Sequence, residues 1–238
     1  MKMAANSQTE ANVYIYGEIV NFQWDDTDVS ASSFKNDLNN LGDLSTINLF
    51  VNSPGGSVFE GVAIYNMLKR HKAKINVHVD GVAASIASVI AMSGDTIFMP
   101  KNSMLMVHNP WTIGMGNATD FRKLADDLDR IGNSAKQTYL SKAGDKLAED
   151  TLQTLLDNET WLSADEALAF GLCDVVEEAN QMAACADSDM LQKYKNVPKA
   201  LLEQPKNTIS AEEMAERQLI AKQAQENISN LNTILGGM

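Results

Sequence analysis

The stretch Gly81-Val82-Ala83-Ala84-Ser85-Ile86-Ala87-Ser88 joins two segments of different periodicity. Residues 75–80 alternate apolar and polar side chains as a strand does, whereas residues 85–92 are apolar on every side, as in a buried helix. This pattern predicts a strand, a turn and a helix, with the Ser85 hydroxyl at the helix N-terminus. Backbone N–H groups and the positive end of the helix dipole gather there, so negative charge near Ser85 would be stabilised without a metal. On this stretch alone, a turn packed with small residues is the simpler interpretation.

The same succession of strand, turn and helix occurs earlier in the chain. Residues 47–51 form a short apolar run, which is typical of a strand buried on both faces. Asn52-Ser53-Pro54-Gly55-Gly56 follows, and there the proline and the glycines allow the backbone to expose its N–H groups. Residues 57–70 then have the apolar stripe of an amphipathic helix.

Two more strands are predicted at 96–99 and 103–107, and the second of them leads into His108. Repeated strand and helix units predict an α/β domain whose functional loops lie at the carboxyl ends of its strands. Gly55-Gly56, Ser85 and His108 all fall at such ends, which is the first indication that chemistry takes place there.

The remaining pattern divides the chain into four parts. We expect a short polar arm over 1–12, a main domain over 13–178, a linker over 179–209 and an amphipathic helix or solvated tail over 210–238. Within the main domain the other predicted elements are a strand at 13–20, a loop at 24–28, helices at 30–41, 118–143, 147–156 and 164–170, and a strand at 174–177. Ser163 and Glu166 form a capping box that opens the helix at 164–170.

Composition excludes several classes of function. The chain has 238 residues, 45% of them hydrophobic, and a formal net charge of −12, which argues against a nucleic-acid partner. No apolar run suits a signal peptide or a membrane span, so we expect a cytoplasmic protein. Zinc spacings, the Walker pattern and the dinucleotide glycine pattern are all missing, so no metal or cofactor is expected. Cys173, in an apolar context, is predicted to be a small buried filler.

The three histidines have different settings. His71 ends an amphipathic helix, where it suits the helix dipole, and His78 lies on the polar face of its strand, where a surface role suffices. His108 follows the apolar run Leu105-Met106-Val107 and is the best candidate for a general base, with a satisfied core histidine as the alternative.

Among the serines, Ser85 is the best candidate for a nucleophile because of its place at a helix N-terminus. Ser88 lies inside the same helix and Ser53 precedes a proline, so structural roles explain both. The G-x-S-x-G pattern of α/β-hydrolases is absent around Ser85.

Four motifs occur in an order that resembles the proteolytic subunit of the Clp protease family. They are Asn52-Ser53-Pro54-Gly55-Gly56, Gly81-Val82-Ala83-Ala84-Ser85, Met106-Val107-His108-Asn109-Pro110 and Leu162-Ser163-Ala164-Asp165-Glu166-Ala167. The resemblance covers about residues 13 to 176 and implies an α/β spiral of strand–strand–helix units, shared with the crotonase superfamily, with a protruding helix for ring contacts. Trp161 and Lys69-Arg70-His71-Lys72 are most similar to the phage and prophage branch, which the resemblance associates with processing of capsid or scaffold proteins in head maturation.

The resemblance also assigns roles to residues. It implies that Ser85 is the nucleophile and His108 the general base, and that the backbone N–H groups of Gly56 and Ile86 form the oxyanion hole. The family's acid lies four residues before Ser163, which is the position of Glu159. Asp157 is close enough to compete for this role.

These roles imply a serine endopeptidase that works through an acyl-enzyme inside an oligomeric chamber, on protein or peptide substrates. The resemblance implies stacked rings, heptameric in the family, with residues 112–143 as the contact between rings. Because the arm 1–12 is short, an ATP-driven unfoldase as partner stays an open question. The alternatives are a crotonase-like acyl-CoA enzyme, and a catalytically silent shell or scaffold component of the same fold.

Overall fold

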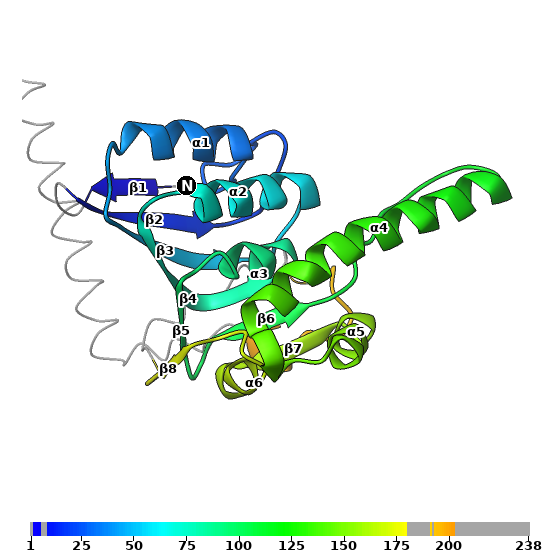
Figure 1. The fold of residues 1–238 in the computed structure, drawn as a ribbon. Coiled ribbons are helices and arrows are strands. Elements are labelled where there is room, and N and C mark those ends of the chain that lie inside the picture. Colours follow the sequence, from blue (N-terminus) through cyan, green and yellow to red (C-terminus); the bar gives the residue numbers. More distant parts are fainter. Residues whose placement is uncertain (1, 6–8, 180–190, 192, 203–238) are drawn as a thin grey trace, which may run out of the picture. The chain divides into compact units, whose positions relative to one another are not determined.

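An eight-stranded, mostly parallel sheet runs through the chain (Figure 1). The computed structural model describes residues 2–5, 9–179, 191 and 193–202, which all belong to one compact unit, so the helix predicted within 210–238 lies outside them. The strands are β1 (Lys2–Ala5), β2 (Glu10–Tyr16), β3 (Thr46–Ser53), β4 (Lys74–Ala84), β5 (Thr96–Pro100), β6 (Met104–Val107), β7 (Thr160–Ser163) and β8 (Val175–Glu177).

The order of the strands is β1-β2-β3-β4-β5-β8, and β6 pairs with β4 and with β7. Among the strands in the described part of the chain, only the pairs β1–β2 and β6–β7 are antiparallel. The helices are α1 (Ala31–Asn40), α2 (Val58–Arg70), α3 (Ile86–Ala91), α4 (Ala118–Ala143), α5 (Glu149–Asp157), α6 (Ala164–Ala169) and α8 (Lys199–Leu202), with a 3₁₀ turn at Gly144–Lys146. This arrangement confirms the predicted α/β fold.

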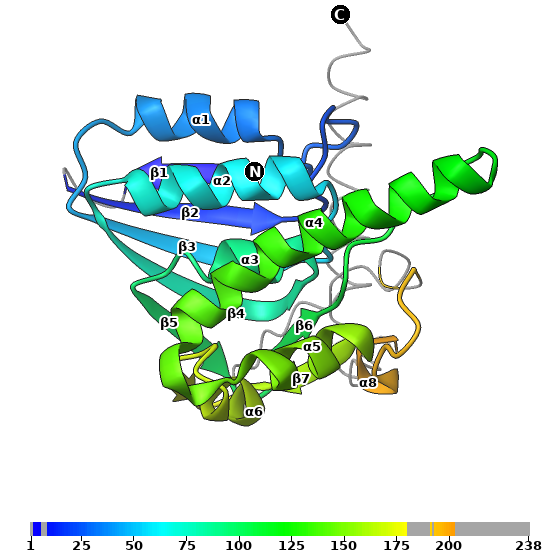
Figure 2. The ribbon, with the colours of Figure 1, turned by 45° about the vertical axis from the view of Figure 1, so that its right-hand side comes forward.

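The helices α1, α2 and α3 cover one face of the sheet (Figures 1 and 2). Alternate residues of the central strands point into this layer and are fully buried, as Val13, Leu49 and Val77 illustrate. They pack with helix residues such as Phe34 and Ile64 in one apolar cluster. Burial of each side chain of this size contributes about 1.5–3 kcal/mol to the free energy of folding. This layer therefore holds the strands, and with them the strand ends, in place.

The opposite face of the sheet has a row of rings across four strands. Tyr14 stacks on Phe50, with ring centroids 4.9 Å apart, and His78 lies between Phe50 at 4.9 Å and Phe98 at 4.7 Å. The sequence predicts a surface position for His78, but the stacked rings leave it half-buried, and this burial lowers its pKa.

Helix α4 has the length that its stripe predicts and extends beyond the sheet (Figure 2). Its buried residues, Lys136, Tyr139 and Ala143, all lie in its C-terminal half. Phe121, at the other end of the stripe, is 49% exposed, and the preceding loop has Ile113 and Met115 exposed at 86% and 98%. The apolar end of α4 therefore has little cover within the described part of the chain.

Several features of the fold differ from the prediction. The sheet begins before residue 13, because β2 starts at Glu10 and β1 pairs with it in place of a free arm. Strand β7 was not predicted, because its four residues are too few to show a period. Part of the predicted linker, residues 193–202, packs against the body, with Tyr194 7% exposed. The capping box of Ser163 and Glu166 is confirmed, and so is the buried position of Cys173.

Candidate active site

Strand β4 brings the chemistry-bearing loops together because it changes partners along its length. Its first half pairs with β5 through residues 76–78, and its last residues, Val82–Ala84, pair with β6. The sequence predicts a turn from Gly81, but pairing with β6 keeps the backbone extended to Ala84. Strand β4 thus ends directly at Ser85, beside the strand that leads into His108.

Ser85 and His108 are in hydrogen-bonding contact. The distance between Ser85 Oγ and His108 Nε2 is 2.7 Å, although the two residues lie 23 positions apart in the chain. Ser85 has φ 55° and ψ −127°, a conformation that L-residues rarely adopt and that costs on the order of 1–3 kcal/mol. A strained serine against an imidazole is the arrangement expected of an activated nucleophile and its base.

Hydrogen bonds at both the N–H and the carbonyl group hold the strained backbone of Ser85. Its N–H donates to the Met106 carbonyl oxygen at 3.0 Å, and its own carbonyl oxygen accepts from Ser88 N at 3.0 Å and from Ser88 Oγ at 2.5 Å. Ser88 Oγ is also 2.7 Å from the hydroxyl of buried Tyr139 in α4. Ser88 and Tyr139 are thus supporting residues, and sequence reasoning missed the contribution of Tyr139 because the two lie 51 residues apart.

The Gly55-Gly56 turn lies against the nucleophile. A Cβ atom built on Gly55 would be 2.7 Å from Ser85 Cβ and 3.2 Å from the Ile86 nitrogen. Both glycines have positive φ, 88° and 146°, so the turn depends on residues without a side chain. The two predicted oxyanion donors, Gly56 N–H and Ile86 N–H, thus belong to segments that meet at Ser85.

The surroundings of His108 lower the pKa of its imidazole. Burial lowers the pKa of His108, the Glu159 carboxylate opposes this effect, and the Lys193 ammonium adds to it. The pKa is lowered on balance, which favours the neutral imidazole. In that state Nε2 is free to take a proton from Ser85.

The two candidate acids have different partners. Glu159 interacts electrostatically with His108, and its Oε1 accepts hydrogen bonds from the backbone N–H groups of Lys195 at 2.5 Å and Asn196 at 3.0 Å. Asp157 is exposed and accepts from Asn109 Nδ2 at 2.7 Å and Gln153 Nε2 at 2.8 Å. Glu159 is therefore the carboxylate that faces His108, although the described contacts include no hydrogen bond between these two side chains.

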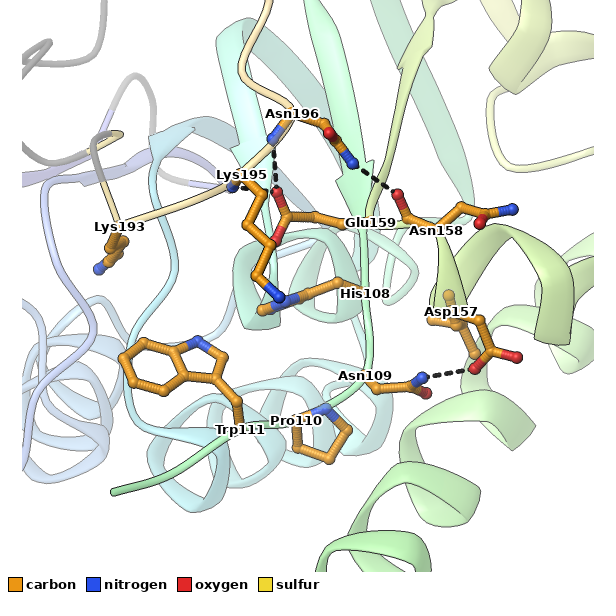
Figure 3. Close-up of a pocket in the computed structure, with 11 residues that line it drawn as sticks. His108, Asn109, Pro110, Trp111, Asp157, Asn158, Glu159, Lys193, Lys195 and Asn196 are labelled. Atoms are coloured by element: carbon orange, nitrogen blue, oxygen red, sulfur yellow. Dashed lines mark hydrogen bonds between the residues drawn. The ribbon is translucent and has the colours of Figure 1, made fainter.

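A pocket of about 400 Å³ opens beside His108 (Figure 3). The loop after β6 lines one side with Asn109, Pro110 and Trp111, and the corner between α5 and β7 lines another. The third side comes from Lys193, Lys195 and Asn196, far along the chain. Sequence reasoning missed this third side, because a polar stretch such as Lys193–Asn196 shows no pattern that points to a site.

The profile of the Clp protease family matches residues 13–180. The chain belongs to the Clp protease family. The match contains both segments that meet at Ser85, as well as His108 and Glu159, whereas Lys193–Asn196 lie beyond it. Membership supports peptidase activity, which makes the protein a hydrolase, and members of the family generally form oligomeric rings. Within the described residues, no helix has the length and apolarity needed to span a membrane.

Proposed function

We propose that this Clp protease family protein is a serine endopeptidase with Ser85 as nucleophile and His108 as general base. The observation that carries the proposal is the 2.7 Å contact between Ser85 Oγ and His108 Nε2, made by a serine in a strained conformation. The lowered pKa of His108 supports it, because a general base must be neutral to accept a proton.

In the proposed reaction, Ser85 Oγ attacks the carbonyl carbon of a peptide bond while His108 Nε2 takes the hydroxyl proton. The N–H groups of Gly56 and Ile86 stabilise the oxyanion that forms. The tetrahedral intermediate then expels the amine, which receives the proton from His108 and leaves an acyl-enzyme on Ser85. Water attacks this ester with His108 again as base, which releases the acid and regenerates the serine.

We place this chemistry inside an oligomeric chamber of stacked rings. The exposed end of α4 and the loop before it, with Ile113, Met115 and Phe121, supply apolar surface for the contact between rings. A heptamer and a phage capsid or scaffold substrate are the finer parts of this proposal. The heptamer rests on the resemblance to the family as a whole, and the phage substrate rests on the resemblance of the Lys69-Arg70-His71-Lys72 helix end and of Trp161 to the phage branch.

Labelling with a fluorophosphonate probe tests the proposal. The parent protein should be labelled at Ser85, as located by mass spectrometry, and should cleave peptides. Ser85→Ala and His108→Ala should lose both activities while they elute from a sizing column like the parent. Ser141→Ala, which changes an exposed serine on α4, is the control and should behave like the parent. Labelling that persists in Ser85→Ala would overturn the proposal.

A further inference from the structure

A segment from beyond the matched family region covers the candidate active site. It consists of residues 191 and 193–202 and is called here the covering segment. Leu191 is fully buried and Tyr194 is 7% exposed, and both pack with Val82, Ala84 and Met106 in a small apolar cluster of their own. Because Ala84 and Met106 adjoin Ser85 and the His108 loop, this cluster lies beside the reacting groups.

Tyr194 occupies the space next to the nucleophile. Its hydroxyl donates to the Pro54 carbonyl oxygen at 2.5 Å, and its ring meets the His108 ring edge-on with centroids 5.3 Å apart. Burial raises the pKa of Tyr194 to about 12, against the opposing effect of a hydrogen bond with the Ser85 side chain. The phenol thus touches all three loops that a substrate carbonyl has to approach.

The covering segment also holds the candidate acid. The N–H groups of Lys195 and Asn196 donate to Glu159 Oε1, and Asn196 Nδ2 donates to the Asn158 carbonyl oxygen at 2.8 Å. Figure 3 shows these contacts above His108. Both backbone bonds reach the same oxygen, so they fix the direction in which the Glu159 carboxylate points, and the described hydrogen bonds of this carboxylate go to the covering segment and not to His108.

Some of the contacts that hold the covering segment are weak. Lys193 pairs with Glu18 at 2.5 Å, but their side chains are 27% and 38% exposed, and the solvent weakens ion pairs of this kind. Trp161, whose ring meets that of Tyr194 at 6.1 Å, has its buried Nε1–H without an acceptor among the described residues. An unsatisfied buried donor is destabilising, so the arrangement in which Tyr194 packs against Trp161 includes an unfavourable contribution.

We propose that the covering segment is an intramolecular inhibitor, which keeps the peptidase latent until a substrate or partner displaces it. Tyr194 takes the place that a substrate needs beside Ser85, and the hydrogen bonds of Glu159 go to the backbone of Lys195 and Asn196 in place of the His108 ring. This inference rests on the proposed function, since it concerns access to the same nucleophile.

The first test is the second-order rate constant for fluorophosphonate labelling of Ser85 in the full-length protein. If the open form is a minor population, the apparent rate constant is reduced by its fraction, so Tyr194→Ala should label about tenfold faster or more. Tyr194→Phe keeps the ring but loses the bond to Pro54, and should label about threefold faster. Lys199→Ala, at an exposed position of the same segment, is the control and should stay at the parent rate.

The second test needs no substitution and uses trypsin cleavage after Lys195 in the parent protein. Because a probe on Ser85 Oγ has to displace Tyr194, cleavage should be faster in the labelled protein than in the unlabelled protein. Equal cleavage rates would overturn the inference even where Tyr194→Ala fails to fold. Labelling that Tyr194→Ala slows or leaves unchanged would also overturn it, and the proposed function would still stand. Absence of Ser85 labelling in every variant would overturn both.

Discussion

Ser85 and Glu159 are the two non-glycine residues with positive φ in the part of the chain that the structure describes, at 55° and 48°. Ser85 is fixed from within the body, by the Met106 carbonyl on one side and by Ser88 and Tyr139 on the other. Glu159 follows α5, where its N–H donates to the Leu156 carbonyl, but its carboxylate is held by the covering segment.

The difference indicates which part of the site is preorganised. Strain at Ser85 is maintained by buried hydrogen bonds, so the geometry of nucleophile and base exists before any substrate arrives. Glu159 also has a positive φ, but its side chain is bonded to a segment 36 residues further along the chain. The backbone of Ser85 is therefore held by the body of the domain, whereas the Glu159 carboxylate is held by the covering segment.

The largest effect is expected from a change in the glycine turn that lies against Ser85. Gly55→Ala places a Cβ atom 2.6 Å from the Ala84 carbonyl oxygen at a φ of 88°, so the turn has to move away from Ser85. Loss of one oxyanion donor alone reduces rates by about 100-fold or more, and we expect at least this loss in Ser85 labelling.

Gly42→Ala is the matched control for that change. Gly42 has a similar φ of 75°, but a Cβ atom there has no neighbour within 4 Å. This variant should lose about 1 kcal/mol of unfolding free energy in urea denaturation and keep the parent labelling rate. Equal losses of labelling in both variants would show that general instability, not the position of the turn, explains the effect.

The next effect concerns Glu159, whose carboxylate is held by the covering segment. Glu159→Gln should slow Ser85 labelling by about tenfold or less, far below the loss of about 10⁴ that follows when an acid in direct contact with its imidazole is neutralised. The same change made in Tyr194→Ala should slow labelling more, because the displaced segment frees Glu159 for His108. Asp157→Asn should change the rate by less than about twofold in both backgrounds, since its partners are Asn109 and Gln153. Equal effects of Glu159→Gln in the two backgrounds would contradict the idea that the segment holds the acid.

A smaller effect tests the support beneath Ser85. Tyr139→Phe removes the hydroxyl that meets Ser88 Oγ but leaves the bond from Ser88 to the Ser85 carbonyl. We expect a loss of about 1 kcal/mol in unfolding free energy and labelling that is about threefold slower. Tyr14→Phe, on the opposite face of the sheet, is the control and should leave labelling unchanged.

The smallest effect is on the pH dependence of labelling. His108 has to be neutral, so the rate falls as the pH drops through its pKa. The charge of Lys193 lowers this pKa and that of Glu159 raises it. Lys193→Gln should therefore move the acid limb of the profile to higher pH, and Glu159→Gln should move it to lower pH, when rates are measured from about pH 5 to pH 8. Shifts in the same direction would contradict the assignment of the limb to His108.

The surroundings of Ser85 and His108 could largely be predicted from the sequence. The glycine turn, the small-residue stretch and the strand before His108 are local patterns, and the parallel sheet brings their ends together. The contacts between the covering segment and the site could not be predicted in the same way. Tyr194 and Lys195 lie in a polar segment without a period, and their contacts with Pro54 and Glu159 depend on tertiary packing. The turn predicted at Gly81 was wrong for a related reason, because pairing with β6 outweighs the local preference of glycine.

The change of partner along β4 has a mechanical consequence. Ser85 is the residue that follows this strand, and β6, which leads into His108, is bonded to the strand's last three residues and to the Ser85 N–H itself. If β4 tilts or shifts, we therefore expect the Ser85 hydroxyl and the His108 imidazole to move together. In such a movement we expect the distance between Ser85 Oγ and His108 Nε2 to change less than the distance from His108 to Glu159, which lies beyond α5 on another segment.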